Sequence, residues 1–206
     1  VAQSPSLMAS PGFCDLSASV VNGQTNFYRV TALTTTAEES LPSAILAAVP
    51  HAFASDDEFL DYVQQCHFDY FWYLANPRNG LIPDRSTTNS PCSIAAVGFG
   101  LTAIGIGVDH GWIFRTQGVA RVLTTLNTFL NGPQGPSSSG TIGYKGWFYH
   151  FLDMNTALRS PSTELSSIDT TLLLAGILYA KQFFDATNTD ETTIRAMADA
   201  ILNRVD

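Results

Sequence analysis

The sequence predicts a mainly α-helical protein of the α/α-toroid class, preceded by a short β region. Near residue 50, the spacing of apolar residues changes from the alternation of strands to the three- and four-residue steps of helices. Helical segments then follow one another, several of them opened by recognisable capping residues. Long loops rich in aromatic, acidic and polar residues separate alternate helix pairs. This arrangement favours a toroid over a compact bundle.

Residues 1–50 are predicted to form strands. The segment from Asn26 to Leu33 is rich in aromatic and β-branched residues, and its residues Tyr28, Val30 and Ala32 share one parity. Around it lie a turn at 20–23 that tolerates positive φ, a polar break at 38–43 and a last strand at 44–49.

Residues 51–206 have helical spacing. The first helix is predicted to open with the capping box from Ser55 to Glu58 and to stop at Asn76-Pro77. The second is predicted from Cys92 to about His110, with Ser90-Pro91 as its N-cap and first-position proline. It is apolar nearly all round, which indicates a buried helix, and its glycines at 98, 100, 105 and 107 are predicted to let neighbouring backbones come close. Further helices are predicted at about 116–130, 166–184 and 190–203, the last with Asn188 and Glu191 in capping-box spacing. The aromatic segment at 146–153 is predicted to be extended or irregular.

Composition excludes several classes of function. The 206 residues are 14% charged, carry a formal net charge of −8 and include ten basic residues without a cluster, so nucleic acid is not an expected partner. There is no uninterrupted apolar run of about 18 residues, so no membrane span is expected. The cysteines, Cys14, Cys66 and Cys92, lie far apart without a CxxC pair, which indicates neither a zinc site nor a disulfide framework. No metal and no cofactor is expected.

The acidic residues are unusually sparse in the middle of the chain. Five acids occur between Tyr70 and Phe184, so each needs its own explanation. Most of them lie in three loops, at 79–86, 146–153 and 162–170, together with aromatic and polar residues. Carbohydrate chemistry needs this mixture, because sugar faces stack on rings, hydroxyls bond to carboxylates, and glycosidic cleavage requires a pair of carboxyls. The five acids are Asp84, Asp109, Asp153, Glu164 and Asp169.

Five strings of the sequence, in order, resemble the glycoamylase-like family that includes glycoside hydrolase family 144. The resemblance implies an (α/α)6 toroid that acts on glucans, with endo-hydrolysis of β-1,2-glucan as the expected activity. It also implies that residues 51–206 are the N-terminal half of the toroid, which we expect to be inactive alone. The strings are 68–72, 79–86, 93–101, 146–153 and 164–170, the last followed by 172–176.

Residues 1–50 resemble the C-terminal part of a fibronectin type III β-sandwich. The resemblance rests on the strings 21–25, 27–32 and 39–43, although Asn26 stands where that family has its corner tyrosine. The pairing of this domain with a glycoamylase-like domain implies an extracytoplasmic protein, periplasmic or secreted.

Three carboxylates are the predicted catalytic residues. Glu164 is the first choice for general acid or base, because it lies just ahead of a helix start with aromatic residues upstream. Its neighbours leave its pKa open, since apolar groups would raise it and the helix N-terminus would lower it. Asp169 either caps the helix with Ser166 or contacts the substrate. Asp84 is either a turn acid paired with Arg85 or part of the sugar site.

The predicted substrate-binding residues lie in the same loops. Trp147 and Tyr149 are either a sugar platform or core, and His150 either bonds a sugar or packs as a satisfied histidine. Asp153 is either a contact or the acceptor of a turn. The predicted set is Arg85, Trp147, Tyr149, His150, Asp153 and Ser166.

Three functions are therefore compared. A glycoside hydrolase acting on an oligo- or polysaccharide is favoured. The alternative is a non-catalytic carbohydrate-binding or surface protein on the same toroid, which would lack one of the two carboxylates. A lyase or epimerase for acidic sugars fits less well, because an acidic, lysine-poor chain repels a polyanion.

Overall fold

The computed structural model describes residue 15, residues 18–50 and residues 52–205. The chain divides into two compact units, Val1–Asp61 and Tyr62–Asp206. The first 14 residues of the predicted β domain, Cys14 among them, lie outside the described residues.

The first unit contains the expected antiparallel strand pair. Strand β1 (Asn26–Tyr28) pairs with β2 (Leu46–Ala48), and Asn26 lies opposite Ala48. The turn before β1 is present, because the Gln24 N–H donates to the Val21 carbonyl over 3.1 Å and Gly23 has a φ of 80°. The strands are shorter than the sequence pattern indicates.

Serine side chains explain why the ladder is short. The N–H groups of Val30 and Ala32 donate to the hydroxyl oxygens of Ser43 and Ser40, over 3.0 and 2.9 Å. Such side-chain acceptors compete with the carbonyls of a regular ladder. The segment after Tyr28 is therefore still tied to its neighbour, but not as a strand.

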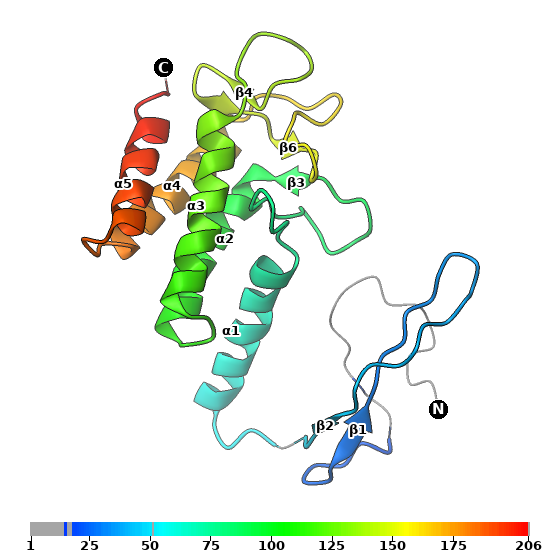
Figure 1. The fold of residues 1–206 in the computed structure, drawn as a ribbon. Helices are drawn as coiled ribbons and strands as arrows, with labels where there is room; N and C mark the ends of the chain where they lie inside the picture. Colours follow the sequence, from blue (N-terminus) through cyan, green and yellow to red (C-terminus); the bar gives the residue numbers. More distant parts are fainter. Residues whose placement is uncertain (1–14, 16–17, 51, 206) are drawn as a thin grey trace. The chain divides into compact units, whose positions relative to one another are not determined.

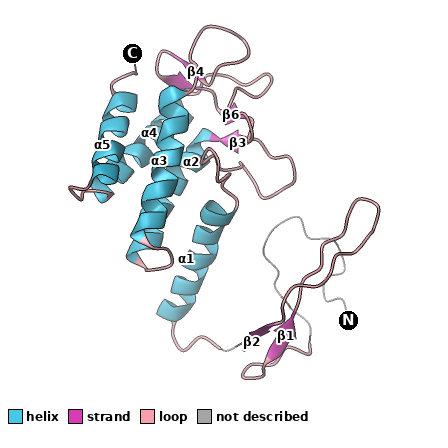
Figure 2. Cartoon of the chain, in the orientation of Figure 1, coloured by secondary structure: helices cyan, strands magenta, loops and turns pink. Residues whose placement is uncertain are grey.

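All the predicted helices are present in the described part of the chain (Figure 2). Ser166 and Asn188 cap α4 and α5 as their spacing predicts, each accepting a hydrogen bond from the backbone N–H three residues on. The helices are α1 (Asp56–Tyr73), α2 (Ile94–Asp109), α3 (Arg115–Asn131), α4 (Ser167–Phe183) and α5 (Thr189–Leu202).

The start of α2 differs from the prediction. Cys92 and Ser93 form strand β3, which pairs antiparallel with β6 (Phe151–Leu152). This pairing holds Cys92 in an extended backbone, so the helix begins two residues later than expected. Ser93 rather than Ser90 is the N-cap, and its hydroxyl accepts from the Ala96 N–H. The proline after Ser90 therefore precedes a strand instead of opening the helix.

Helices α2 and α4 touch through their backbones at two glycines. A Cβ atom on Gly98 would collide with the Leu172 carbonyl, and one on Gly176 would collide with the backbone of Gly98. Farther along, Gly105 lies against the ring of Tyr179. Both helices therefore run in the same direction, and the prediction that glycines permit close approach is confirmed at Gly98.

Helices α3 and α5 form a second parallel pair. Near their N-terminal ends Arg115 bonds to Glu191, and at the other end Arg204, just after α5, donates to the carbonyl of Leu130 in the last turn of α3 over 2.7 Å. Among the described helices, the most extensive contacts are those within these two pairs. One layer contains α2 and α4 and the other contains α3 and α5, as in part of an α/α toroid.

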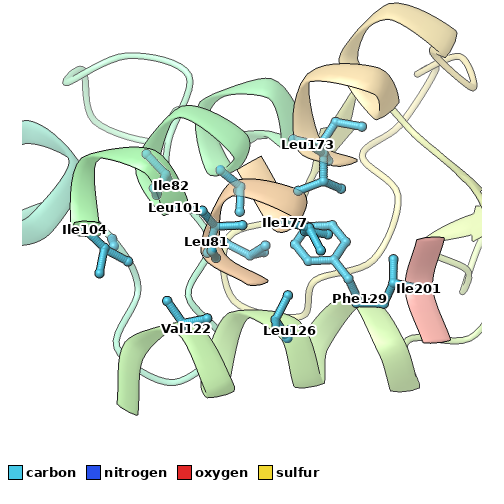
Figure 3. Close-up of a cluster of buried hydrophobic side chains, with 14 of the residues drawn as sticks. Leu81, Ile82, Leu101, Ile104, Val122, Leu126, Phe129, Leu173, Ile177 and Ile201 are labelled. Carbon is cyan, nitrogen blue, oxygen red and sulfur yellow. The ribbon is translucent and has the colours of Figure 1, made fainter. Parts of the chain in front are cut away.

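The core fills the space between the two layers (Figure 3). Leu126 and Phe129 of α3 point from one side toward Leu101 of α2 and Ile177 of α4, and all four side chains are buried. Leu81, from the loop before α2, closes the same cluster. Burying residues of this size contributes about 1.5–3 kcal/mol each.

Short strands gather where α2 and α4 begin (Figure 1). Strand β4 (Gly143–Tyr144) pairs with β5 (Trp147–Phe148) across a turn in which Lys145 and Gly146 both have positive φ. The Phe148 N–H donates to the Thr170 hydroxyl in the first turn of α4, over 3.0 Å. The aromatic segment is extended at β5 and β6 and irregular between them, which agrees with the prediction.

No helix within the described residues combines the length and the apolar character that a membrane crossing requires.

Candidate functional site

Backbone hydrogen bonds join the three acidic loops at the start of α2. The Ser93 N–H donates to the Ile82 carbonyl and the Ile94 N–H donates to the His150 carbonyl, each over 3.2 Å. The His150 N–H then donates to the Glu164 carbonyl over 3.0 Å. The loops at 79–86, 146–153 and 162–170, which are far apart in sequence, therefore form one continuous rim.

His150 lies between two of the predicted catalytic carboxylates. Its Nδ1 is 2.9 Å from Oε1 of Glu164, and its Nε2 is 3.6 Å from Oδ1 of Asp169. The imidazole ring stacks on the ring of Phe151 with centroids 3.7 Å apart. The structure thus brings the carboxylates of Glu164 and Asp169 together around the imidazole ring of His150.

The electrostatics of Glu164 answer the question that the sequence left open. Its own backbone N–H and then the hydrogen bond from His150 lower the pKa of its carboxyl below the usual range. The side chain is 64% exposed, so burial opposes this lowering only weakly. The carboxylate is therefore ionised at neutral pH.

Asp169 combines the two roles that the sequence offered. The Ser166 hydroxyl accepts from the Asp169 N–H over 3.1 Å and donates to Oδ2 of the same residue. This is the capping interaction, which holds the start of α4. The other oxygen, Oδ1, faces His150, and the side chain is 17% exposed. Asp169 therefore caps the helix while one oxygen stays directed at the site.

Asp84 and Arg85 form an ion pair with each other. Oδ2 of Asp84 accepts from Nε and Nη2 of Arg85 over 2.9 and 2.6 Å. Their loop lies in the rim, because the Asp84 N–H donates to the Pro91 carbonyl next to β3. Among the described residues, no hydrogen bond or ion pair joins these two side chains to Glu164 or Asp169.

The carboxylate of Asp153 is engaged in its own turn. Oδ1 accepts from the backbone N–H of Asn155 and from both the N–H and the hydroxyl of Thr156, over 2.8–3.0 Å. The bonds from Thr156 are the main cause of a lowered pKa at this carboxyl. This geometry agrees with the turn alternative.

Trp147 and Tyr149 differ in the solvent exposure of their side chains. Tyr149 is 5% exposed, and the Arg159 guanidinium covers its ring at 4.3 Å from the centroid. Trp147 is half-buried on β5. The ring of Tyr149 therefore offers no open face for a sugar in this structure, and the predicted platform is left to Trp147.

The sequence interpretation missed Arg159. Its guanidinium donates through Nε over 2.8 Å, and also through Nη2, to the carbonyl of Thr163, the residue before Glu164. Nη1 donates to the Ser138 carbonyl over 3.1 Å. The sequence could have pointed to Arg159, because the chain has few basic residues and this arginine lies five residues before Glu164. Arg159 fastens the loop that carries the carboxylate.

Replacing Arg159 with lysine should loosen this loop. A lysine cannot make the forked bonds to Thr163, so the loss of about 1 kcal/mol should raise amide exchange at His150 several-fold. Hydrogen exchange measured by NMR checks this, because the His150 N–H is bonded to Glu164. As a matched control, Arg195→Lys removes bonds to the carbonyls of Phe184 and Ala186 and should leave the His150 amide unchanged. Equal exchange in all three proteins would contradict the role of Arg159.

No group of three or more His, Cys, Asp or Glu side chains in the described residues could hold a metal ion. The expectation that the protein needs no metal remains a prediction.

Comparison with known proteins gives one curated relative and several solved structures. An exo-β-1,2-glucooligosaccharide sophorohydrolase (non-reducing end) from Parabacteroides distasonis is 32% identical over 193 residues, which cover 89% of this chain and 25% of the relative. A crystal structure of a β-1,2-glucanase from Parabacteroides distasonis matches with a TM-score of 0.77 and 28% identity, covering 89% of this chain and 26% of that one. A putative glucoamylase from Bacteroides uniformis matches with a TM-score of 0.67 and 27% identity, over 75% and 37% of the two chains.

The matches also define how far the similarity extends. No family model matches the chain. The chain spans about a quarter of the length of the curated relative. Since the second unit contains only residues 62–206, a match over 89% of the chain must include part of the first unit as well. The similarity is therefore not confined to the helices.

Proposed function

We propose that this protein is a glycoside hydrolase of the glycoamylase-like family and that it acts on β-1,2-linked glucan. The observation that carries the proposal is the pairing of Glu164 and Asp169 across His150, at the joined starts of α2 and α4. Two carboxyl groups near one sugar-binding rim are what glycosidic cleavage requires. The names of the relatives support the linkage.

The lowered pKa of Glu164 favours one of its two predicted roles. A carboxylate that is ionised at neutral pH can accept a proton from water or stabilise positive charge on the sugar, but it cannot donate a proton. We therefore assign Glu164 the role of base or charge stabiliser. The proton for the leaving oxygen then comes from a second carboxyl, for which Asp169 and Asp84 remain the predicted residues.

Hydrolysis of purified β-1,2-glucan by the full-length protein tests the proposal. We expect reducing sugar to be released from this glucan and not from β-1,3- or β-1,4-linked glucans. Failure to cleave any of them would contradict the hydrolase. If β-1,2-glucan is bound without cleavage, the alternative of a non-catalytic carbohydrate-binding protein is supported.

The mode of attack is a separate proposal. We propose endo-hydrolysis, which releases a range of oligosaccharides at early times. The exo alternative is favoured by the name of the curated relative, a sophorohydrolase that acts at the non-reducing end. Chromatography of the early products separates the two, because disaccharide alone would contradict the endo mode.

Replacing Trp147 with alanine should weaken binding of the glucan. Loss of an aromatic stacking surface worth about 0.5–1.5 kcal/mol should raise the Kd for β-1,2-glucan oligosaccharides roughly three- to tenfold. Calorimetric titration of the full-length protein measures this. Tyr73→Ala, which removes an exposed ring at the end of α1, is the control and should leave the Kd unchanged. A Trp147→Ala protein that melts much earlier but binds normally would show that this ring serves the fold.

We also propose that residues 1–50 belong to a fibronectin type III-like sandwich and that the protein is extracytoplasmic, periplasmic or secreted. The antiparallel pairing of β1 with β2 and the turn at Gly23 support the first proposal. Fractionation of the source cells tests the second, and recovery of the protein only in the cytoplasm would contradict it.

A further inference from the structure

Both nitrogens of the His150 ring are directed at carboxylates of the 162–170 segment. Glu164 lies in the loop before α4, and Asp169 lies in the first turn of that helix. Among the described charged groups, these two are the ones within 4 Å of the ring nitrogens. A histidine that bonds a sugar needs a free nitrogen, and the arrangement seen here leaves neither nitrogen unopposed.

The backbone of His150 is fixed as firmly as its ring. Its carbonyl accepts from the Ile94 N–H at the start of α2, and its N–H donates to the Glu164 carbonyl. The ring rests on Phe151, with an interplanar angle of 18°. His150 therefore connects α2, the Glu164 loop and the first turn of α4 at a single residue.

We propose that His150 is a positioning residue, which sets the orientation of the Glu164 carboxylate through a hydrogen bond at Nδ1 and that of the Asp169 carboxylate through a longer electrostatic contact at Nε2. This role rests on the proposed glucan hydrolase, and it replaces the sugar contact that the sequence suggested. The hydrogen bond to Glu164 measures 2.9 Å, whereas the contact with Asp169 is 3.6 Å long and purely electrostatic. The Glu164 side chain is also 64% exposed, so apart from its own backbone N–H the hydrogen bond from His150 is its main restraint.

Two amide substitutions separate the bonds. The side-chain nitrogen of asparagine can take the place of Nδ1, and that of glutamine can take the place of Nε2. His150→Asn therefore keeps a donor toward Glu164, and His150→Gln keeps one toward Asp169. His150→Ala removes both.

Steady-state kinetics of the full-length protein on β-1,2-glucan provide the first test. Misplacing a reacting group by about 1 Å costs on the order of 100-fold in rate, so His150→Ala should lower kcat by about that factor with KM nearly unchanged. His150→Asn should recover most of this loss, and His150→Gln should not. A rise in KM without a fall in kcat, or equal loss in all three variants, would overturn the proposal.

A second measurement does not depend on activity. The titration of the Glu164 side-chain carboxyl carbon, followed by NMR, reports the bond to His150 even if β-1,2-glucan is not cleaved. His150→Ala and His150→Gln should raise its midpoint, and His150→Asn should raise it least. An unchanged midpoint in all three would overturn positioning, whereas an inactive wild-type protein with the expected shifts would contradict only the proposed function.

His110→Asn is the matched control for both measurements. His110 caps the C-terminal end of α2, about 24 Å along the helix from Ile94, and stacks on Trp112. Its replacement should leave kcat and the Glu164 titration unchanged. A change in this control equal to that in His150→Ala would overturn the assignment to His150.

Discussion

Replacing Glu164 with glutamine is expected to lower kcat on β-1,2-glucan by about two to four orders of magnitude, the range for a lost proton-transfer group. Glutamine keeps the size of the side chain and can still bond to His150 through its amide. It removes the negative charge that the lowered pKa maintains. KM should change little, and the melting temperature should stay the same, because the side chain is largely exposed.

The pH profile refines this expectation. If Glu164 acts in its ionised form, kcat/KM falls as the pH drops through its pKa, which lies below the usual 4.5. The Glu164→Gln variant should lose this acid limb. Glu38→Gln, in the first unit, is the control and should match the wild type. Near-normal turnover of the Glu164 variant would remove this residue from the mechanism, and Asp169 and Asp84 would be tested next.

Replacing Glu191 with glutamine is expected to lower the free energy of unfolding by about 3 kcal/mol, the lower end for breaking a buried ion pair. Its carboxylate is 3% exposed and accepts from Nε and Nη2 of Arg115 over 2.9 and 2.7 Å. The Ala186 N–H donates to it as well, over 2.9 Å. The pair ties the start of α3 to the start of α5, so thermal unfolding should show the loss directly.

The pH dependence of stability follows from the same pair. The Arg115 hydrogen bonds lower the pKa of Glu191 from 4.5 to about 2. A carboxyl with a depressed pKa in the folded state stabilises the fold fully above about pH 4.5, and this stability is lost as the pH falls toward 2. The Glu191→Gln variant should show a flatter stability curve in that window. A curve as steep as that of the wild type would contradict the assignment.

Asp185 supplies the matched control. It lies 3.4 Å from the same Arg115 guanidinium but is 81% exposed. Exposed ion pairs contribute about 0–1 kcal/mol, so Asp185→Asn should have little effect on unfolding. An equal loss of unfolding free energy in the two variants would show that burial does not decide how much an ion pair with Arg115 stabilises the fold.

Local signals in the sequence predicted the helices well. Ser166 and Asn188 are followed three residues later by an acid, and both cap helices as expected. Such caps depend on neighbours within one turn, which a sequence displays. The start of α2 was misplaced because β3 pairs with β6, a partner about 60 residues away. No local pattern at Ser90 or Cys92 reveals that partner.

The sequence predicted the residues of the site but not the contacts between them. The acids and aromatic residues of the three loops were identified from composition and resemblance. The contact of His150 with Asp169 depends on the path of the loop before α4, and the cover of Arg159 over Tyr149 depends on packing. Both are tertiary interactions, so the sequence could name the residues without showing which of them meet.

The glycine contact between α2 and α4 has a consequence for any attempt to redesign substrate preference. Gly98 and Gly176 let the two backbones touch, and each glycine lies within a few turns of the helix start that bears the site. The distance between the starts of α2 and α4 is therefore set by direct contact of their backbones, which is possible because neither glycine has a side chain. We expect that a methyl group added at either position would widen the rim and alter which sugars fit, although neither residue lies among the rim's own side chains.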